Sequence, residues 1–278
     1  MGVKKIDYNV RKSNITGFTM ETIAVRRTSE EKEYVAGLEK GLAIIEAFGI
    51  QNKALTLSEA AAITGHSRAS ARRSLLTLQR LGYVEWDGKY FHLAPRVLRL
   101  GHAYVTSTAL SKIVQPVLEA LSEHTHESSS LAVLDGSDAV FVARTSTRRS
   151  LSNALGLGSR LPAFCAATGR VLLAALPEDE AELLLKRMKC LPLTPHTRTQ
   201  IPDLLELLDE VRRQGYAVCN EELELGIRSI AVPVRDATGR VIASMSLVGS
   251  TSRHSLENMI DTFLPQLERA RRTLSMML

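Results

Sequence analysis

Residues 55–93 read LTLSEAAAITGHSRASARRSLLTLQRLGYVEWDGKYFHL, and this stretch decides the fold of the first third of the chain. Thr56 and Glu59 have the spacing of a capping box, in which the threonine hydroxyl accepts a hydrogen bond from the glutamate amide while the carboxylate accepts one from the threonine amide. A helix is therefore expected to begin at Leu57. Gly65 provides the turn that ends it.

A second helix is expected from Arg68 to about Arg80, with Ser67 as its N-terminal cap. Apolar residues recur along it at three- and four-residue spacing and predict a buried stripe made of Ala71, Leu75, Leu78 and the following Leu81. The other residues of its first turn and a half are expected to point outward: Arg68, Ser70, Arg72 and Arg73. The helix dipole is positive at this end and disfavours basic residues, so three arginines here indicate a polyanionic partner.

Residues 82–86 and 89–93 alternate like strands around Asp87-Gly88, a dipeptide suited to a two-residue hairpin turn. Two short helices, the second of them basic, followed by a hairpin are typical of a winged helix-turn-helix, which places its second helix in the major groove of DNA. The alternative is a small helical subdomain with a solvated basic face. We predict DNA contacts from Ser67, Arg68, Ser70, Arg72, Arg73 and, in the hairpin, Lys89.

The charge is distributed unevenly along the 278 residues, a length that allows two compact domains. Residues 34–107 carry 9 Lys and Arg against 5 Asp and Glu, whereas residues 108–278 carry 19 against 20. Because their charges nearly balance, residues 108–278 are better suited to bind a protein or a small molecule than to form a second nucleic-acid surface. Residues 1–33 are polar and aperiodic. We interpret them as a flexible arm, in which Arg26 and Arg27 have weak phosphate affinity and Met20 is an alternative start.

The sequence offers little support for an enzyme, a cofactor or a metal site. Cys165, Cys190 and Cys219 are odd in number and lack metal-ligand spacing, and we find no apolar leader or membrane span. We therefore expect a reduced, cytoplasmic protein without membrane association, metal or cofactor.

Three segments contain residues that occur in catalytic or ligand-binding motifs, but each lacks part of the motif. Cys165 is a conceivable nucleophile, but no histidine lies at a diagnostic spacing, and free cysteines are commonly small buried hydrophobes. Residues 156–158, Gly-Leu-Gly, lack the third glycine and the preceding strand of a dinucleotide fingerprint. His124 and His126 point apart on a helix. We predict no catalytic and no metal-binding residues.

Two further helices frame the predicted DNA-binding module. The first spans residues 34–48 and is expected to face inward with Val35, Leu38, Leu42, Ile45 and either Ala47 or Phe48. After the hairpin, Pro95 opens a helical run that continues into the 110s, since proline is favourable at a first helical position. This run joins two domains and offers a place for a dimer to pack. We predict an arm at 1–33, a winged helix-turn-helix domain at 34–94, a linker helix at 95–109 and an effector and oligomerisation domain at 110–278.

The C-terminal part is predicted to be α+β. Strands are expected at 130–135, 139–144, 216–220, 229–235 and 241–247, and helices at 168–176, 178–187, 202–214 and 255–276. Gly136-Ser137 and residues 236–239 have the composition of hairpin connections. The result is a mainly antiparallel sheet flanked by helices rather than a doubly wound fold.

A pair of serines suggests an anion pocket in this domain. Ser244 and Ser246 share one face of their strand, and Met245 and Leu247 take the other. If that face lies across from the helix N-terminus at 167–169, its hydroxyls and the helix dipole both favour an anion. The alternative is that small polar residues simply pack a sheet under a helix. A cation for a carboxylate would come from Arg144, Arg148 or Arg149, although arginines in a hairpin more often face solvent.

Several segments recur in the same order in a known family. They are VAGLEKGL (35–42), the block 55–84, PRVLRLG (95–101), LGSRLP (157–162) with GRVLLA (169–174), and EELELGIRSIA (221–231). Over residues 34–276 the chain resembles the isocitrate lyase regulator (IclR) family of bacterial transcription factors. SRASARR (67–73) and RTSTRRSLS (144–152) are similar to the subgroup that controls aromatic-acid breakdown through the β-ketoadipate pathway.

The resemblance implies operator DNA as a partner, a homodimer or dimer of dimers, and a C-terminal domain of GAF-like shape that binds a small carboxylate. The subgroup implies an activator, hence RNA polymerase as a partner, and an effector such as protocatechuate, 4-hydroxybenzoate or β-ketoadipate. Many relatives have an acidic residue where this chain has Cys219 and a cysteine where it has Ser229. When the family's effector site is carried over to this sequence position by position, the residues that line it are Ala167, Thr168, Gly169, Cys219, Ser229, Ser244 and Ser246.

Two other functions stay open at this point. One is a repressor of another catabolic operon that responds to glyoxylate or a different organic acid. The other is a metabolite sensor that acts through a protein partner and uses its N-terminal module for assembly. A gel shift with DNA separates the second of these from a DNA-binding regulator.

Overall fold

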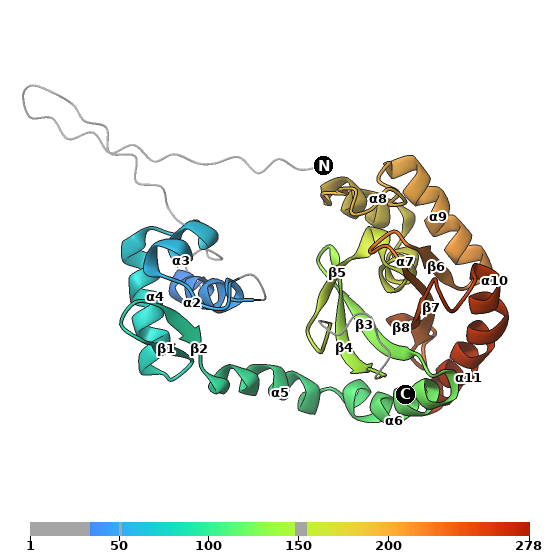
Figure 1. Cartoon of the computed structure of the whole chain (residues 1–278), viewed down its shortest axis with the longest axis horizontal. Coiled ribbons are helices and arrows are strands. Elements are labelled where there is room, and N and C mark those ends of the chain that lie inside the picture. Colours follow the sequence, from blue (N-terminus) through green and yellow to red (C-terminus); the bar gives the residue numbers. More distant parts are fainter. Residues whose placement is uncertain (1–33, 50–51, 148–154) are drawn as a thin grey trace, which may run out of the picture. The chain divides into compact units, whose positions relative to one another are not determined.

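Figure 1 shows the computed structural model of the chain, which describes residues 34–49, 52–147 and 155–278. The chain divides into two compact units, Met1–Val97 and Leu98–Leu278, and each is described by itself. The expected arm at 1–33 lies outside the described residues, and so do Arg148 and Arg149.

The described residues of the first unit form the helices α2 (Ala36–Glu46), α3 (Leu57–Thr64) and α4 (Arg68–Arg80), followed by a hairpin of β1 (Val84–Trp86) and β2 (Phe91–Leu93). The capping box is confirmed, since the Glu59 amide donates to Thr56 Oγ1 at 3.3 Å and the Thr56 amide donates to Glu59 Oε2 at 2.7 Å. Gly65 ends α3 in the left-handed conformation, with φ of 67°. Local hydrogen bonds of this kind fix where a helix begins and ends.

The core of this unit confirms part of the predicted packing. Ala71, Leu75 and Leu78 of α4 are buried as expected. Leu81 is 50% exposed because α4 ends at Arg80, so its place in the stripe was wrong. The inward face predicted for the helix at 34–48 is confirmed for Ala47, which is buried, and for Ile45 and Phe48, which are partly buried, but it is wrong for Val35, Leu38 and Leu42, which are exposed.

The hairpin is shorter than predicted, and its turn is shifted by one residue. The Asp87 amide donates to the Tyr90 carbonyl at 3.1 Å, so Gly88 and Lys89 form the tip instead of Asp87-Gly88. The Asp87 carboxylate accepts from the next backbone amides, which is the local hydrogen bonding that favours aspartate before a turn. Gly88 takes a φ of 105°, a conformation that favours glycine.

The helical run after the hairpin is broken into three pieces. A 3-10 turn at Pro95–Val97 is followed by α5 (Leu98–Ser107) and α6 (Ala109–Thr125). Thr108 is extended, with φ of −99° and ψ of 125°, and therefore interrupts the single helix that the sequence predicted. The linker helix thus consists of α5 alone, and α6 belongs to the packing of the second unit.

The second unit is built on one six-stranded antiparallel sheet with strand order β5-β4-β3-β8-β7-β6 (Figure 1). Its strands are β3 (Ser128–Asp135), β4 (Asp138–Thr145), β5 (Arg160–Pro162), β6 (Ala217–Asn220), β7 (Ile227–Arg235) and β8 (Val241–Ser250). The hairpin connections at 136–137 and 236–239 are confirmed. The short strand β5 was not predicted. The α+β class with an antiparallel sheet is confirmed.

Helices cover both faces of this sheet. They are α7 (Ala167–Ala174), α8 (Glu178–Arg187), α9 (Ile201–Gln214), α10 (Leu256–Asn258) and α11 (Leu264–Ser275). Met245 and Leu247 of β8 pack with α6 and α11, whereas Ala231 of β7 packs with α7 and α9. A π-helical segment at Met259–Phe263 interrupts the single C-terminal helix that we predicted.

Each helix in the described part of the chain is too short or too polar to cross a membrane.

Candidate functional sites

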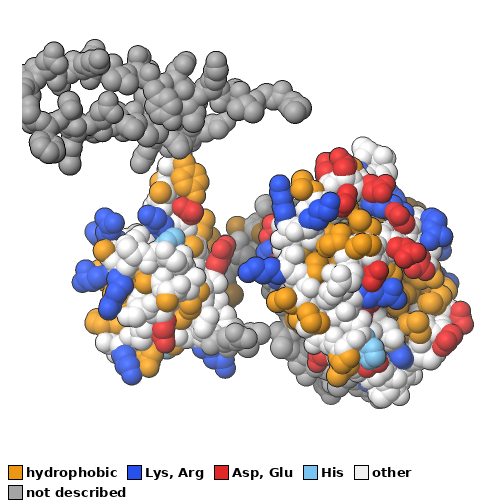
Figure 2. Space-filling model, turned by 90° about the horizontal axis from the view of Figure 1, so that it is seen from above, with side chains coloured by type: hydrophobic (Ala, Val, Ile, Leu, Met, Phe, Trp, Pro, Cys, Tyr) orange, Lys and Arg blue, Asp and Glu red, His pale blue; other side chains and the backbone are white. Residues whose placement is uncertain are grey.

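The start of α4 presents three cations to solvent. Ser67 caps the helix by accepting from the Ser70 amide at 3.3 Å, and Arg68, Arg72 and Arg73 are exposed. Lys and Arg side chains line one side of this unit in Figure 2, with few acidic ones among them. Ser70 corrects the prediction, because only 7% of it is exposed and its side chain belongs to the core side of the helix.

The hairpin holds a fourth cation at its tip. The Asp87 carboxylate accepts from the amides of Tyr90 at 2.7 Å and Lys89 at 2.8 Å, and these bonds lower the pKa of Asp87 to about 2. Lys89 is exposed, and its ammonium lies 4.8 Å from the centre of the Tyr90 ring. The turn is thus fixed by its own hydrogen bonds while the lysine remains accessible to a polyanion.

In the second unit, a small pocket lies between the sheet and the start of α7, with a volume of about 40 Å³. It brings together five of the seven predicted effector residues: Ala167, Thr168, Cys219, Ser229 and Ser246. Arg144, which the sequence offered as a cation for a carboxylate, also lines it. The sequence did not indicate the rest of the lining, which is mainly apolar and comes largely from β4, β5, β7, β8 and the loop after β6. That lining includes Phe141, Leu161, Leu223, Ile227 and Val248.

The two remaining predicted residues do not line this pocket. A Cβ on Gly169 would lie 2.3 Å from the Cα of Ala163, so this glycine allows α7 to approach the preceding backbone closely. Ser244 is fully buried, and its hydroxyl has no hydrogen-bond partner among the described residues. Ser246 shares its face of β8 and forms a 2.8 Å hydrogen bond with Ser130 Oγ.

A buried ion pair lies beside the pocket. Arg170 Nη1 donates to Glu222 Oε1 at 2.7 Å and Nη2 donates to Oε2 at 2.5 Å, while Nε donates to the Phe164 carbonyl at 3.0 Å. Both side chains are almost completely buried, so the pair links α7 to the loop after β6. Nothing in the sequence marked these two residues as partners, because 52 positions separate them.

The cysteines and histidines behave as structural groups in the described residues. Burial raises the pKa of both Cys165 and Cys219 to about 12, which keeps the thiols neutral and poorly nucleophilic. His124 contacts the Ala120 carbonyl at 3.0 Å, and His126 ends α6 with φ of 57°. No group of three or more metal-ligating side chains occurs among the residues that the structure describes.

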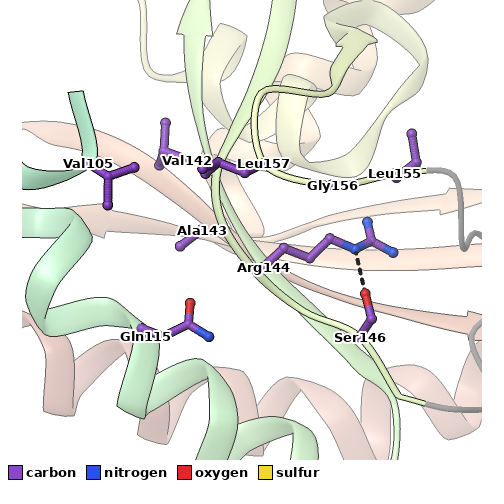
Figure 3. A pocket seen from close by; sticks show the side chains of 9 residues that line it. All are labelled: Val105, Gln115, Val142, Ala143, Arg144, Ser146, Leu155, Gly156 and Leu157. Carbon is purple, nitrogen blue, oxygen red and sulfur yellow. Dashed lines mark hydrogen bonds between the residues drawn. The ribbon is translucent and has the colours of Figure 1, made fainter. Parts of the chain in front are cut away.

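A second cavity of about 440 Å³ lies where α5 and α6 meet β4. Figure 3 shows Val105 of α5 and Gln115 of α6 on one side of it, with Leu155, Gly156 and Leu157 on the other. Arg144 of β4 lines both this cavity and the small pocket, as does Leu155.

Two family models together match most of the chain. The IclR helix-turn-helix domain matches residues 37–88, and the C-terminal domain of the bacterial transcriptional regulator IclR matches residues 102–276. The chain belongs to the IclR family of bacterial transcriptional regulators. This confirms the resemblance drawn from the sequence segments.

Curated relatives in the IclR family are similar along nearly their whole length. The Pca operon regulatory protein of Acinetobacter baylyi is 38% identical and shares 90% of this chain and 91% of its own. The p-hydroxybenzoate hydroxylase transcriptional activator of the same species is 40% identical, over 88% of this chain and 93% of its own.

Solved structures show the same architecture. A transcriptional regulator from Rhodococcus sp. RHA1 is 42% identical with a TM-score of 0.77, covering 88% of this chain and 98% of that one. The inducer-binding domain of a double mutant of the Acinetobacter transcription factor PobR, in complex with 3-hydroxybenzoic acid, is 36% identical with a TM-score of 0.56. It covers 59% of this chain and 96% of its own.

Membership of the IclR family settles the class of function. The family consists of DNA-binding transcriptional regulators and not of enzymes, in agreement with the interpretation of the sequence. A helix-turn-helix domain that binds DNA and a C-terminal domain that binds a small-molecule effector are therefore the functional parts of this IclR protein.

Proposed function

We propose that this protein activates genes for the breakdown of aromatic acids, of the β-ketoadipate pathway type, in response to a small carboxylate. The observation that carries the proposal is its 38% and 40% identity, along nearly the full chain, to regulators named for the Pca operon and for p-hydroxybenzoate hydroxylase. The protein acts as a homodimer or dimer of dimers on operator DNA and, as an activator, works with RNA polymerase.

Operator DNA is bound through the start of α4 and the tip of the hairpin. Arg68, Arg72 and Arg73 are exposed on one helix, as a recognition helix requires for contacts with base edges and phosphates. Ser67 holds the helix start, and Lys89 contacts a phosphate from the hairpin. Ser70 is buried and serves the packing of the helix.

The effector is bound in the pocket between α7 and the sheet. Ala167 and Thr168 bring the positive end of α7 to it, and Ser229 and Ser246 bring hydroxyls from the sheet, which favours an acid. Cys219 contributes a neutral, buried thiol. The effector class is that of protocatechuate, 4-hydroxybenzoate and β-ketoadipate. Gly169 shapes this site by allowing α7 to pack closely.

The test measures DNA binding with and without acids. Fluorescence anisotropy with promoter fragments that flank the protein's own gene should show saturable, salt-sensitive binding, changed by at least one of protocatechuate, 4-hydroxybenzoate and β-ketoadipate. In vitro transcription with RNA polymerase should increase in that acid's presence. A response to glyoxylate alone, with lowered transcription, supports a repressor of another operon. No binding to any promoter fragment supports a sensor that acts through a protein.

A further inference from the structure

A β-bulge controls which side chains of β4 face α7. Leu131 of β3 pairs with Ala143, but the next residue, Ala132, pairs with Phe141, so Val142 is an extra residue in β4. Without it, Phe141 and Arg144 would lie on opposite faces, because side chains alternate along a strand.

With the bulge, both residues lie on the face that carries the pocket. The Arg144 guanidinium lies 5.3 Å from the centre of the Phe141 ring, and both side chains line the pocket. Arg144 is also in register with Ser130 of β3, which in turn is in register with Ser246 of β8. The arginine therefore belongs to the same row of side chains as Ser130 and Ser246, of which Ser246 lines the pocket.

The charges around the pocket favour this arginine as the group that meets an acid. Two acidic residues line the pocket: Glu222, whose carboxylate is paired with Arg170 in a bidentate arrangement, and Glu224, which is exposed. Among the described residues that line the pocket, Arg144 carries the cationic side chain. Partial burial lowers the pKa of Arg144, because desolvation disfavours its charged form.

The volumes of the two cavities that Arg144 lines also favour this residue as the one that meets the effector. The pocket of about 40 Å³ is small for an aromatic acid, which needs more room. The neighbouring cavity of about 440 Å³ shares Arg144 and Leu155 with the pocket. In Figure 3 the Arg144 side chain lies along the larger cavity, where its Nε donates to Ser146 Oγ at 3.3 Å.

We propose that Arg144 binds the carboxylate of the effector where these two cavities meet, and so makes the site specific for acids over their neutral analogues. This inference rests on the proposed function, because it assigns the group that recognises the effector class named there. The aromatic ring then lies toward Phe141 and Ser246, which also line the pocket.

The test is calorimetry of the full chain with matched acid and amide probes. The acids are 4-hydroxybenzoate and protocatechuate, and the neutral analogues are 4-hydroxybenzamide and 3,4-dihydroxybenzamide. Arg144→Gln should weaken acid binding by roughly 10- to 100-fold, the range expected for one charge-assisted hydrogen-bonded interaction, and leave amide binding within about twofold. Arg144→Lys should recover part of the acid affinity. Arg240→Gln, at an exposed arginine of the 236–239 hairpin, is the matched control.

The outcomes separate this inference from the proposed function. If the parent protein binds an acid and Arg144→Gln binds it equally well, or loses acid and amide affinity in parallel, Arg144 has no carboxylate-binding role. If the parent binds none of these acids, the effector class itself is wrong and the assignment of Arg144 falls with it. Melting temperatures of both Arg144 variants, measured alongside, show whether the fold is retained.

Discussion

Arg72 and Arg73 stand on the exposed side of α4, near the end of the helix where the dipole disfavours positive charge. Negatively charged DNA bound at this end of the helix would offset the unfavourable interaction of the two arginines with the dipole. We expect Arg72→Ala or Arg73→Ala to weaken operator binding. A base contact would cost about 1 to 3 kcal/mol and relax specificity, whereas a phosphate contact would reduce the salt slope by about one. Anisotropy titrations at several salt concentrations measure both quantities.

The matched control for these variants is Arg80→Ala, at the other end of the same helix, where a basic side chain is favourable. It should change operator affinity less than either of the other two substitutions. Equal affinity and equal salt slope for Arg72→Ala, Arg73→Ala and the parent would show that α4 does not contact DNA.

The backbone around Gly169 leaves no room for a side chain at this position. A Cβ at this position would lie 2.3 Å from both the Cα and the carbonyl oxygen of Ala163, and these are backbone atoms that cannot turn aside. We expect Gly169→Ala to destabilise the second unit by about 1 to 3 kcal/mol or more, the cost of overpacking a core. Thermal unfolding measures the loss. Gly41→Ala in α2 is the control, because nothing lies near its added Cβ and alanine favours a helix. A Gly169→Ala protein as stable as its parent would contradict the close packing of α7.

At the scale of elements, the Arg170–Glu222 pair ties α7 to the loop after β6. Glu222→Gln leaves a buried guanidinium without its counter-charge, and breaking a buried pair in this way costs about 3 to 5 kcal/mol. We expect a lower midpoint in chemical denaturation and weaker effector binding, since both linked elements line the pocket. Glu206→Gln, at an exposed residue of α9 that does not line the pocket, should have little effect on stability or effector binding. Similar midpoints for the two variants would argue against a stabilising role of the pair.

Elements with local signals were predicted well. The bounds of α3 and α4 follow from Thr56, Glu59, Gly65 and Ser67, whose hydrogen bonds reach only three or four residues along the chain. The α8 helix was also predicted with its bounds. By contrast, the extended Thr108 carries no comparable local signal, and β5 has only three residues.

The site was predicted less completely, because it depends on contacts between distant residues. The family resemblance located Thr168, Ser229 and Ser246, which line the pocket. The ion pair of Arg170 with Glu222 joins residues far apart in sequence, and the bulge at Val142 is a property of strand register. Periodicity along one segment contains neither kind of information.

At the scale of the whole molecule, the exposed apolar side chains point to a partner. On α2 they are Leu38 and Leu42, with Val35 directly before the helix, and on α5 they are Leu98, Leu100 and Tyr104. Periodicity predicted that these residues of the first helix face inward, but in the single chain they are exposed. A second copy of the chain would explain their apolar character, in agreement with the proposed dimer.

A dimer also gives the effector a means of controlling DNA binding. An effector shifts the spacing of two recognition helices only through its different affinity for the two dimer arrangements. Operator half-sites fix that spacing near one helical turn or a multiple, roughly 34 Å or more. The α5 helix connects the DNA-binding unit to the effector unit in sequence, so contacts made by α5 with a partner chain would affect both.

Leu98 is 74% exposed on α5, which makes it a sensitive position for testing this coupling. A charge buried against an apolar partner surface is strongly unfavourable, so Leu98→Glu should dissociate the dimer and abolish operator binding. Effector binding to the full chain should persist, because Leu98 does not line the pocket. Light scattering, anisotropy and calorimetry measure these three properties. Leu191→Glu, at an exposed leucine between α8 and α9, should leave all three unchanged. If Leu98→Glu remains dimeric and still responds to effector on DNA, coupling between the units does not depend on this face of α5.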